Sequence, residues 1–278
     1  MSLYIASLNS GSNGNCYYIG NQHEAVLIDA GLSCRETEIR LGRARLNFNK
    51  IKAVFITHEH YDHTRGVEVI AKKYQLPVYI SQATHGNSRL KLDKKLVNDF
   101  IAYSPVIIGG LEINAFPKLH DAKEPHSFIV SCEGITVGVL TDVGSACDHV
   151  IRNFRQCHAI FLEANYDDEM LENGSYPAYL KTRIRSDYGH LSNHQALELF
   201  TTHRPDFMSH VLLSHLSQDN NNPRLAQQLF LRHAGGTKIV VASRHQESPV
   251  FHITGEKVDH QSLPKVDPPL NYIQTTLF

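Results

Sequence analysis

Long apolar runs are absent from this sequence, and their absence limits where the protein can act. No stretch approaches the roughly 18 continuous apolar residues that a membrane-spanning helix needs. The opening, MSLYIASLNSGSNGNC, has no cationic segment followed by an apolar run, as a secretion signal would. We therefore expect a cytoplasmic protein with no membrane partner.

Cysteine is sparse, and its spacing argues against two kinds of stabilising site. The five cysteines are odd in number and form no C-x-x-C pair: Cys16, Cys34, Cys132, Cys147 and Cys157. This pattern favours neither a disulfide framework nor a thiolate zinc site. We expect reduced thiols that fill the interior.

A strong charge of either sign is also missing. The formal net charge is -1, so the whole molecule has no overall attraction for nucleic acid or membranes, and any polyanion site must be a local patch. Two basic clusters are candidates, although both also fit solvated helix faces. They are Lys181, Arg183 and Arg185 in one segment, and Arg89, Lys91, Lys94 and Lys95 in another.

The order of apolar segments predicts an α/β fold. Residues 3–8, 15–20 and 24–31 form one antiparallel set of expected strands, and residues 111–116, 126–132 and 135–142 form a second. Helix-like segments follow each set. This order predicts two mixed β-sheets packed face to face with helices outside, in one domain over residues 1–262. The remaining residues, 263–278, form a tail in which three prolines discourage regular structure.

Histidine is abundant, with 18 copies, and four metal-seeking side chains follow one expected strand. The segment THEHYDH contains His58, His60, Asp62 and His63 directly after the strand-like residues 53–57. In extended backbone His58 and His60 point to one side and can hold one cation, while Asp62 and His63 lie beyond the bend and can hold another.

Four residues cannot complete two metal sites, so further ligands must come from other strand ends. His120, Asp142 and His215 each stand where an apolar run stops. His126 competes with His120 for the same role. The cluster and these strand ends together predict a metal centre at one edge of the sheets.

These motifs, with Asp29 in LIDAG, resemble the five ordered motifs of the metallo-β-lactamase-fold hydrolases. The resemblance implies a four-layer αβ/βα sandwich with two divalent metal ions between the sheets. It implies that His58, His60 and His120 bind one metal, that Asp62, His63 and His215 bind the second, and that Asp142 bridges them. Asp29 would orient the ligand loop, or it could instead cap the turn at Gly31. A site with two carboxylates should accept zinc or manganese.

Two further residues resemble those of nucleases in this superfamily. Glu163 in FLEANYD and His190 in GHLSNHQA stand in the order in which tRNA-processing members carry a glutamate and a histidine. This implies that His190 is a general acid, oriented by Glu163. Asp62 is expected to be needed for turnover for a different reason, because its carboxylate shares the cations at a strand end. The alternative for His190 is a turn residue ahead of a helix.

The combined motifs resemble the YycJ (WalJ) subfamily, which implies a DNA exonuclease. They are SLNSGSNGNCYYIG, HDAKEPHSF, TDVG, GHLSNHQAL and LLSHLSQDNNNP. Only 73 positions separate Asp142 from His215, too few for the large inserted domain of RNA-degrading relatives. The NSGSNGN loop could bind phosphate through its amides or could simply form a hairpin. Other hypotheses are a hydrolase of lactones, thioesters or cyclic nucleotides, and a metal-binding scaffold.

The tail ends in NYIQTTLF, which resembles a peptide that docks on the bacterial sliding clamp. Gln274, Leu277 and Phe278 match its Gln-x-x-Leu-Phe pattern. A sliding clamp is therefore a candidate partner. In the alternative, Leu277 and Phe278 fold back over an apolar patch of their own domain.

Overall fold

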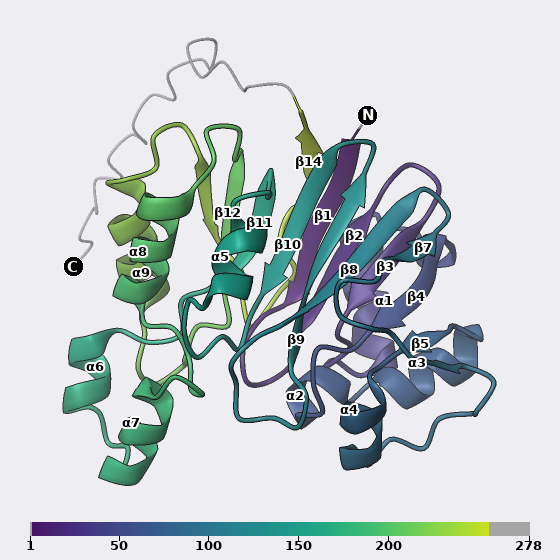
Figure 1. The fold of residues 1–278 in the computed structure, drawn as a ribbon, viewed down its shortest axis with the longest axis horizontal. Coiled ribbons are helices and arrows are strands. Elements are labelled where there is room, and N and C mark those ends of the chain that lie inside the picture. The colour runs from purple at the N-terminus through teal and green to yellow at the C-terminus, as the bar shows by residue number, and fades with distance from the viewer. Residues whose placement is uncertain (1, 256–278) are drawn as a thin grey trace, which may run out of the picture.

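The computed structural model describes residues 2–255 and shows two seven-stranded sheets packed face to face (Figure 1). The first sheet has the order β14-β1-β2-β3-β4-β5-β6. Its strands are β1 (Ser2–Asn9), β2 (Cys16–Gly20), β3 (Ala25–Ile28), β4 (Ile51–Phe55), β5 (Val78–Tyr79), β6 (Val97–Asn98) and β14 (Phe251–Thr254).

The second sheet has the order β13-β12-β11-β10-β9-β8-β7. Its strands are β7 (Val106–Ile108), β8 (Leu111–Pro117), β9 (His126–Cys132), β10 (Ile135–Leu140), β11 (Ala159–Glu163), β12 (His210–Ser214) and β13 (Lys238–Val241). Strands β7 to β10 are antiparallel, and β10 to β13 are parallel, so the sheet is mixed as predicted.

Three apolar clusters define the layers. One contains inward-facing residues of both sheets, such as Tyr17, Phe128 and Phe161, and fills the space between them. The other two cover the outer faces, under the helices on each side. The helices are α1 (Cys34–Arg43), α2 (Tyr61–Thr64), α3 (Val67–Tyr74), α4 (Gln82–Asn87), α5 (Asp148–Phe154), α6 (Asp168–Asn173), α7 (Ala178–Arg185), α8 (Asn193–His203) and α9 (Pro223–Leu231), with a 3-10 turn η1 (Phe48–Lys50). The predicted four-layer sandwich is confirmed.

The cysteines meet the expectation for reduced packing residues. All five are free thiols, and four of them are buried, whereas Cys147 is half-buried. Each helix within residues 2–255 is too short or too polar to span a membrane. The tail 263–278 and its clamp-like residues Gln274, Leu277 and Phe278 lie outside the described residues.

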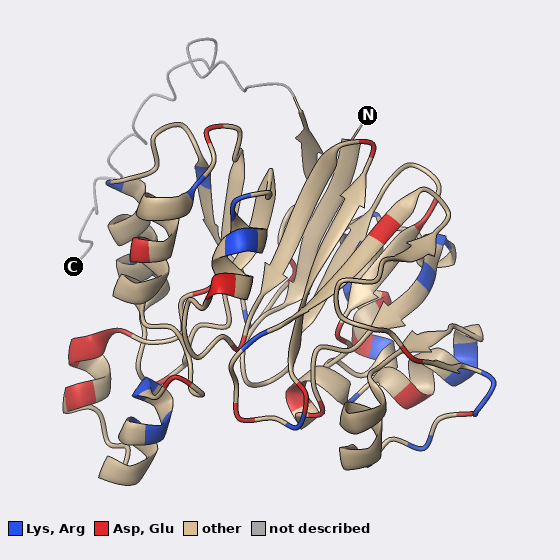
Figure 2. Ribbon diagram, viewed as in Figure 1, with Lys and Arg blue, Asp and Glu red and all other residues tan. Residues whose placement is uncertain are grey.

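The helical pair α6–α7 stands apart from the sandwich in Figure 1 and has its own small apolar cluster, around Leu171 and Ile184. The basic cluster of α7 is mostly neutralised there. Arg183 pairs with Asp121 through its Nε at 2.6 Å, and Arg185 pairs with Glu172. Figure 2 shows acidic residues on α6 and basic residues on α7 side by side.

Candidate metal centre

All the predicted site residues except His190, which lies between α7 and α8, follow or end strands at one edge of the two sheets. His58 comes shortly after β4, His120 after β8, Asp142 after β10 and His215 after β12, while Glu163 is the last residue of β11. The carboxyl ends of parallel strands lie at a common edge, where α/β proteins place ligands. Segments up to 157 positions apart in the sequence therefore meet.

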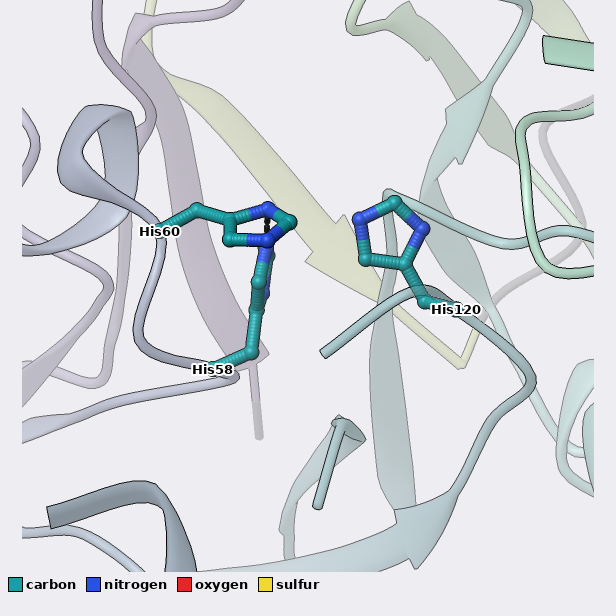
Figure 3. Close-up of side chains that lie close together, drawn as sticks. All are labelled: His58, His60 and His120. Atoms are coloured by element: carbon teal, nitrogen blue, oxygen red, sulfur yellow. Dashed lines mark hydrogen bonds between the residues drawn. The ribbon is translucent and has the colours of Figure 1, made fainter. Parts of the chain in front are cut away.

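The first group consists of His58, His60 and His120, whose side chains converge in Figure 3. One ring nitrogen from each lies within 4.8 Å of the others, a spacing that a single cation can bridge. The Nε2 of His58 lies 3.0 Å from the Nδ1 of His60. His58 is fully buried, and His120 nearly so.

The second group consists of Asp62, His63 and His215, again with ligand atoms within 4.8 Å of one another. The Oδ2 of Asp62 lies 3.5 Å from His63 Nε2 and 3.6 Å from His215 Nε2. Asp142 lies between the two groups. Its Oδ2 is 3.0 Å from His63 Nε2, and its Oδ1 is 3.8 Å from His120 Nε2. A carboxylate in this place can contact two cations at once.

The hydrogen bonds of the imidazole rings fit this ligand set. His120 Nδ1 donates to the carbonyl of Gly189 at 3.0 Å, which leaves the lone pair on Nε2. His63 Nδ1 contacts Asp29 Oδ2 at 2.6 Å, and His215 Nδ1 contacts Glu163 Oε1 at 3.0 Å. The Nε2 atoms of His120 and His215 are buried and have no hydrogen-bond partner within residues 2–255. Buried lone pairs aimed into a shared space are what a bound cation requires.

The pKa shifts of His58 and His120, in the first group, are opposite in direction to that of His215 in the second. Burial lowers the pKa of His58 well below its usual value and that of His120 to about 4, so both rings are neutral ligands at pH 7. Burial also opposes a charge on His215, but Asp142, Asp62 and Glu163 outweigh it and raise the pKa of His215 to about 10. The second group therefore carries a positive charge that cations would replace.

Three site residues occupy left-handed backbone conformations. The φ angles are 60° at Asp29, 54° at Asp142 and 55° at His215, each within two residues of the end of a strand. For residues other than glycine such conformations cost on the order of 1–3 kcal/mol each, and they cluster at functional sites.

Close backbone contacts fix the loops that carry the ligands. A Cβ at Gly31 would lie 1.6 Å from the carbonyl oxygen of Asp62, and one at Gly144 would lie 2.0 Å from that of Asp187. Only glycine permits these approaches. The loop after β3 therefore packs directly on the His58–His63 loop, and the loop after β10 packs on the segment that carries His190.

Asp29 acts from outside the ligand groups. Its carboxylate accepts hydrogen bonds from the backbone N–H and the hydroxyl of Thr57, both at 2.9 Å, besides its contact with His63. This is the arrangement expected for a residue that orients the ligand loop, rather than a cap on the turn at Gly31. His126, the competitor of His120, lies at the start of β9 against Phe100 and belongs to none of the metal-binding groups within residues 2–255.

Glu163 and His190 form a pair beside Asp142. His190 Nδ1 lies 2.9 Å from Glu163 Oε1 and 3.8 Å from Asp142 Oδ1. The other carboxylate oxygen of Glu163 accepts from the backbone N–H of Val143 at 2.7 Å. Burial raises the pKa of Glu163. The charge and the hydrogen bond of His190 outweigh burial and lower that pKa to about 2. The His190 side chain is 19% exposed, so a substrate can contact it.

Three residues that the sequence pattern did not single out support the centre. Asn15 Nδ2 lies 3.1 Å from Asp62 Oδ2 and 3.0 Å from His63 Nε2, and Ser10 Oγ accepts from the backbone N–H of His215 at 2.7 Å. Lys118 is buried and donates to the carbonyl of Thr141 at 2.6 Å. The NSGSNGN motif was a signal for the first two, but nothing in the pattern around Lys118 distinguishes it from a surface lysine.

Comparisons with known proteins agree with this geometry. Residues 24–216 match the family described as "Beta-lactamase superfamily domain". The chain is 36% identical over 232 residues to "Exodeoxyribonuclease YycJ" of Bacillus anthracis, covering 82% of this chain and 87% of that protein. It is 34% identical over 229 residues to "Exodeoxyribonuclease WalJ" of Streptococcus pneumoniae, covering 81% and 85%.

Solved structures show the same fold. The metallo-beta-lactamase fold protein YhfI from Bacillus subtilis superposes with a TM-score of 0.71 over 91% of this chain and 100% of that one, at 15% sequence identity. Identity at this level supports the fold alone, whereas the two sequence relatives support the chemistry. The chain therefore belongs to the metallo-β-lactamase superfamily, as a metal-dependent hydrolase similar to the YycJ and WalJ proteins.

Proposed function

We propose that this protein is a DNA exonuclease that hydrolyses phosphodiester bonds with two divalent metal ions, zinc or manganese. The observation that carries the proposal is the contact between Glu163 and His190 beside Asp142. Hydrolysis of a phosphodiester needs a proton for the leaving oxygen, and a histidine held by a buried carboxylate suits that task. The names of the two sequence relatives support DNA as the substrate.

The seven residues that would hold the metals are His58, His60, His120, Asp62, His63, His215 and the bridging Asp142. When bound, the two ions supply an activated water and neutralise the charge that develops on the phosphate. Zinc and manganese both accept this mixture of imidazole and carboxylate ligands. Asp29 and Asn15 keep the ligand loop in place, and loss of either Asp62 or Asp142 would remove a carboxylate on which turnover depends.

His190 performs the proton transfer in this proposal. Its Nδ1 is held by Glu163, so its Nε2 is the nitrogen that can donate to the leaving oxygen. Glu163 stabilises the positive charge that His190 carries before the transfer. Because Glu163 also accepts backbone N–H groups, it stays fixed while the ring of His190 exchanges its proton.

The surface beside the centre suits a nucleic acid strand. A groove of about 650 Å³ runs past His60 and is lined by Tyr61, Arg65 and Arg89. It also contains Glu59 and Glu68, whose carboxylates accept hydrogen bonds from Asn87 and from the backbone of Lys91. Tyr61 is 72% exposed, and an exposed aromatic ring next to a reaction centre can stack on a base. A DNA substrate implies a cytoplasmic location, where bacterial DNA is found.

A substrate panel tests the proposal. End-labelled single-stranded and double-stranded DNA is incubated with the protein and either manganese or zinc, beside a lactone, a thioester and a cyclic nucleotide. The expected result is stepwise shortening of DNA from an end. Intact DNA together with rapid hydrolysis of one of the small substrates would instead assign the centre to small-molecule hydrolysis.

A further inference from the structure

A second, smaller cavity shares no lining residue with the groove at Tyr61. It has a volume of about 280 Å³ and lies between the loop after β1, the segment after β12 and the segment after β13. Two contacts place it next to the second metal-binding group. Ser10 lines the cavity and accepts the backbone N–H of His215, and Leu216 lines it directly after that ligand.

The lining combines apolar side chains, such as Leu216 and Val241, with polar ones, and it contains no carboxylate. Hydroxyl groups come from Ser10, Ser217 and Ser243, and amide groups from Gln218 and Asn221. Arg244 supplies a permanent positive charge. Asp219, the acidic residue of the adjoining loop, already accepts a hydrogen bond from Tyr176. A cavity with one guanidinium, several hydroxyls and no acidic group favours an anion.

Arg244 itself lacks the partners that a guanidinium normally has. Within residues 2–255 no carboxylate forms an ion pair with it, and its Nη2 donates to the hydroxyl of Ser12 at 3.0 Å. Its Nη1 is shielded from solvent but has no acceptor among the described residues. A buried N–H without an acceptor costs about 1–3 kcal/mol, and more for a charged group, so such a group calls for an explanation.

The backbone around Arg244 is held in place before any ligand arrives. The N–H of Ser10 donates to the carbonyl of Ser243 at 3.1 Å, and Asn13 Nδ2 donates to the carbonyl of Arg244 at 2.8 Å. Beneath them, the buried Arg40 donates to the carbonyls of Leu8 and His245. The backbone that carries Arg244 is therefore fixed before a ligand binds, and only its side chain has to adjust.

The same contacts favour the hairpin over the phosphate-binding hypothesis for the NSGSNGN loop, because four of its amides are already hydrogen-bonded. The amides of Ser10, Gly11, Gly14 and Asn15 all donate to acceptors within the protein. These amides are not free to surround a phosphate. The loop folds as a hairpin, and the side chain of Arg244 supplies the free donor at its edge.

We propose that this cavity binds a phosphate of the substrate strand next to the one that is cleaved, with Arg244 as the anion-binding residue. The inference rests on the proposed function, because it places a DNA strand across the metal centre. Arg244 would then contribute to binding of the DNA strand rather than to the hydrolysis step. A guanidinium can hold a phosphate through two parallel hydrogen bonds, and Nη1 is the donor left for it.

The test compares Arg244→Gln with the intact protein on two substrates. For a single-stranded DNA oligonucleotide, kcat/KM should fall about tenfold or more through KM, and the slope of log KM against log salt should fall by about one. For bis(4-nitrophenyl) phosphate, which has a single phosphate, kcat/KM should stay within about twofold. Arg232→Gln is the matched control, because Arg232 is an exposed arginine directly after α9, at the edge where β13 begins and away from the ligands.

A binding measurement separates failure of the cavity from failure of the proposed function. A fluorescein-labelled phosphorothioate oligonucleotide, which resists cleavage, is titrated with metal-loaded protein, and Kd is read from fluorescence anisotropy. Arg244→Gln should weaken binding about tenfold, and Arg244→Lys should weaken it less. Equal Kd values for the intact protein and Arg244→Gln overturn the inference, as does an equal loss on both hydrolysis substrates. If the intact protein fails to degrade DNA, the proposed function falls, and the anisotropy still decides whether Arg244 binds phosphate.

Discussion

Four imidazole rings of the centre are fixed to the protein through the same nitrogen, Nδ1. In His63, His120 and His215, Nδ1 is held by a carboxylate or a carbonyl, and Nε2 faces the shared space. An outer hydrogen bond of this kind sets the tautomer and makes the ring a better ligand. In His190 the same Nδ1 contact with Glu163 leaves an Nε2 that a substrate can contact.

The role of His190 can be tested by substitution. His190→Ala should slow DNA cleavage by roughly 10²-fold or more, because proton donation to the leaving oxygen would be lost. Metal content should stay the same. A nitrophenyl phosphodiester, whose leaving group needs no proton, should be affected much less. The matched control is His194→Ala, since His194 is an exposed histidine that pairs with Asp168. Equal losses on both substrates would contradict proton donation.

His126 provides a pH prediction that does not involve the ligands. Burial lowers the pKa of His126 from its usual 6.5, and its Nδ1 is buried without a partner within residues 2–255. Below about pH 6.5, His126 therefore binds a proton in the unfolded chain but stays neutral in the folded protein. The free energy of unfolding falls as the pH falls. The fall in Tm between pH 7.5 and 5.5 should be smaller in His126→Phe than in the intact protein. An unchanged pH dependence would show that this ring does not contribute.

At the scale of elements, the centre depends on loops that interlock after the strands. The loop after β3 and the His58–His63 loop touch at Gly31, where even a methyl group would overlap the carbonyl of Asp62. Gly31→Ala should therefore displace the ligand loop, lower bound metal and destabilise the protein by about 2 kcal/mol or more. Thermal unfolding and plasma emission measure both effects.

Gly86→Ala is the control for this substitution. Gly86 lies in α4, and an added Cβ meets nothing within 4 Å. Alanine is the better helix former, so this change should keep metal content and raise stability by about 0.5–1 kcal/mol. If Gly31→Ala behaved like Gly86→Ala, the contact between the two loops would not control the ligands.

Much of this arrangement could be predicted from the sequence, because strands and their ends leave simple patterns. Apolar runs ending in His58, Asp142 or His215 indicated where the strands stop, and the parallel order indicated a shared edge. The long-range hydrogen bonds and ion pairs between polar side chains could not be predicted in this way. Asn15 contacts Asp62 from 47 positions away, and Arg183 of the basic cluster pairs with Asp121 from 62 positions away. Long-range pairing of polar side chains depends on tertiary structure, which no local pattern specifies.

At the scale of the whole molecule, the two sheets contribute to one centre. His58, His60, Asp62 and His63 come from the first sheet, whereas His120, Asp142 and His215 come from the second. Metals held by both would oppose separation of the sheets and stabilise the native state through binding. Chelation with EDTA should lower Tm by roughly 10 °C, given about 4 kcal/mol of binding stabilisation. Zinc or manganese should restore it. If neither EDTA nor added metal changed the Tm, bound metal would not be what holds the two sheets together.

Metal content measured together with DNA degradation tests the central claim most directly. The intact protein and Asp142→Ala are loaded with zinc or manganese, dialysed, and analysed by plasma emission, and each is then incubated with end-labelled DNA. We predict two ions per chain and stepwise degradation for the intact protein. For Asp142→Ala, we predict fewer than two ions per chain, no degradation and a fold largely retained. Two ions per chain and full activity in Asp142→Ala would contradict the bridging role and the dinuclear centre built on it.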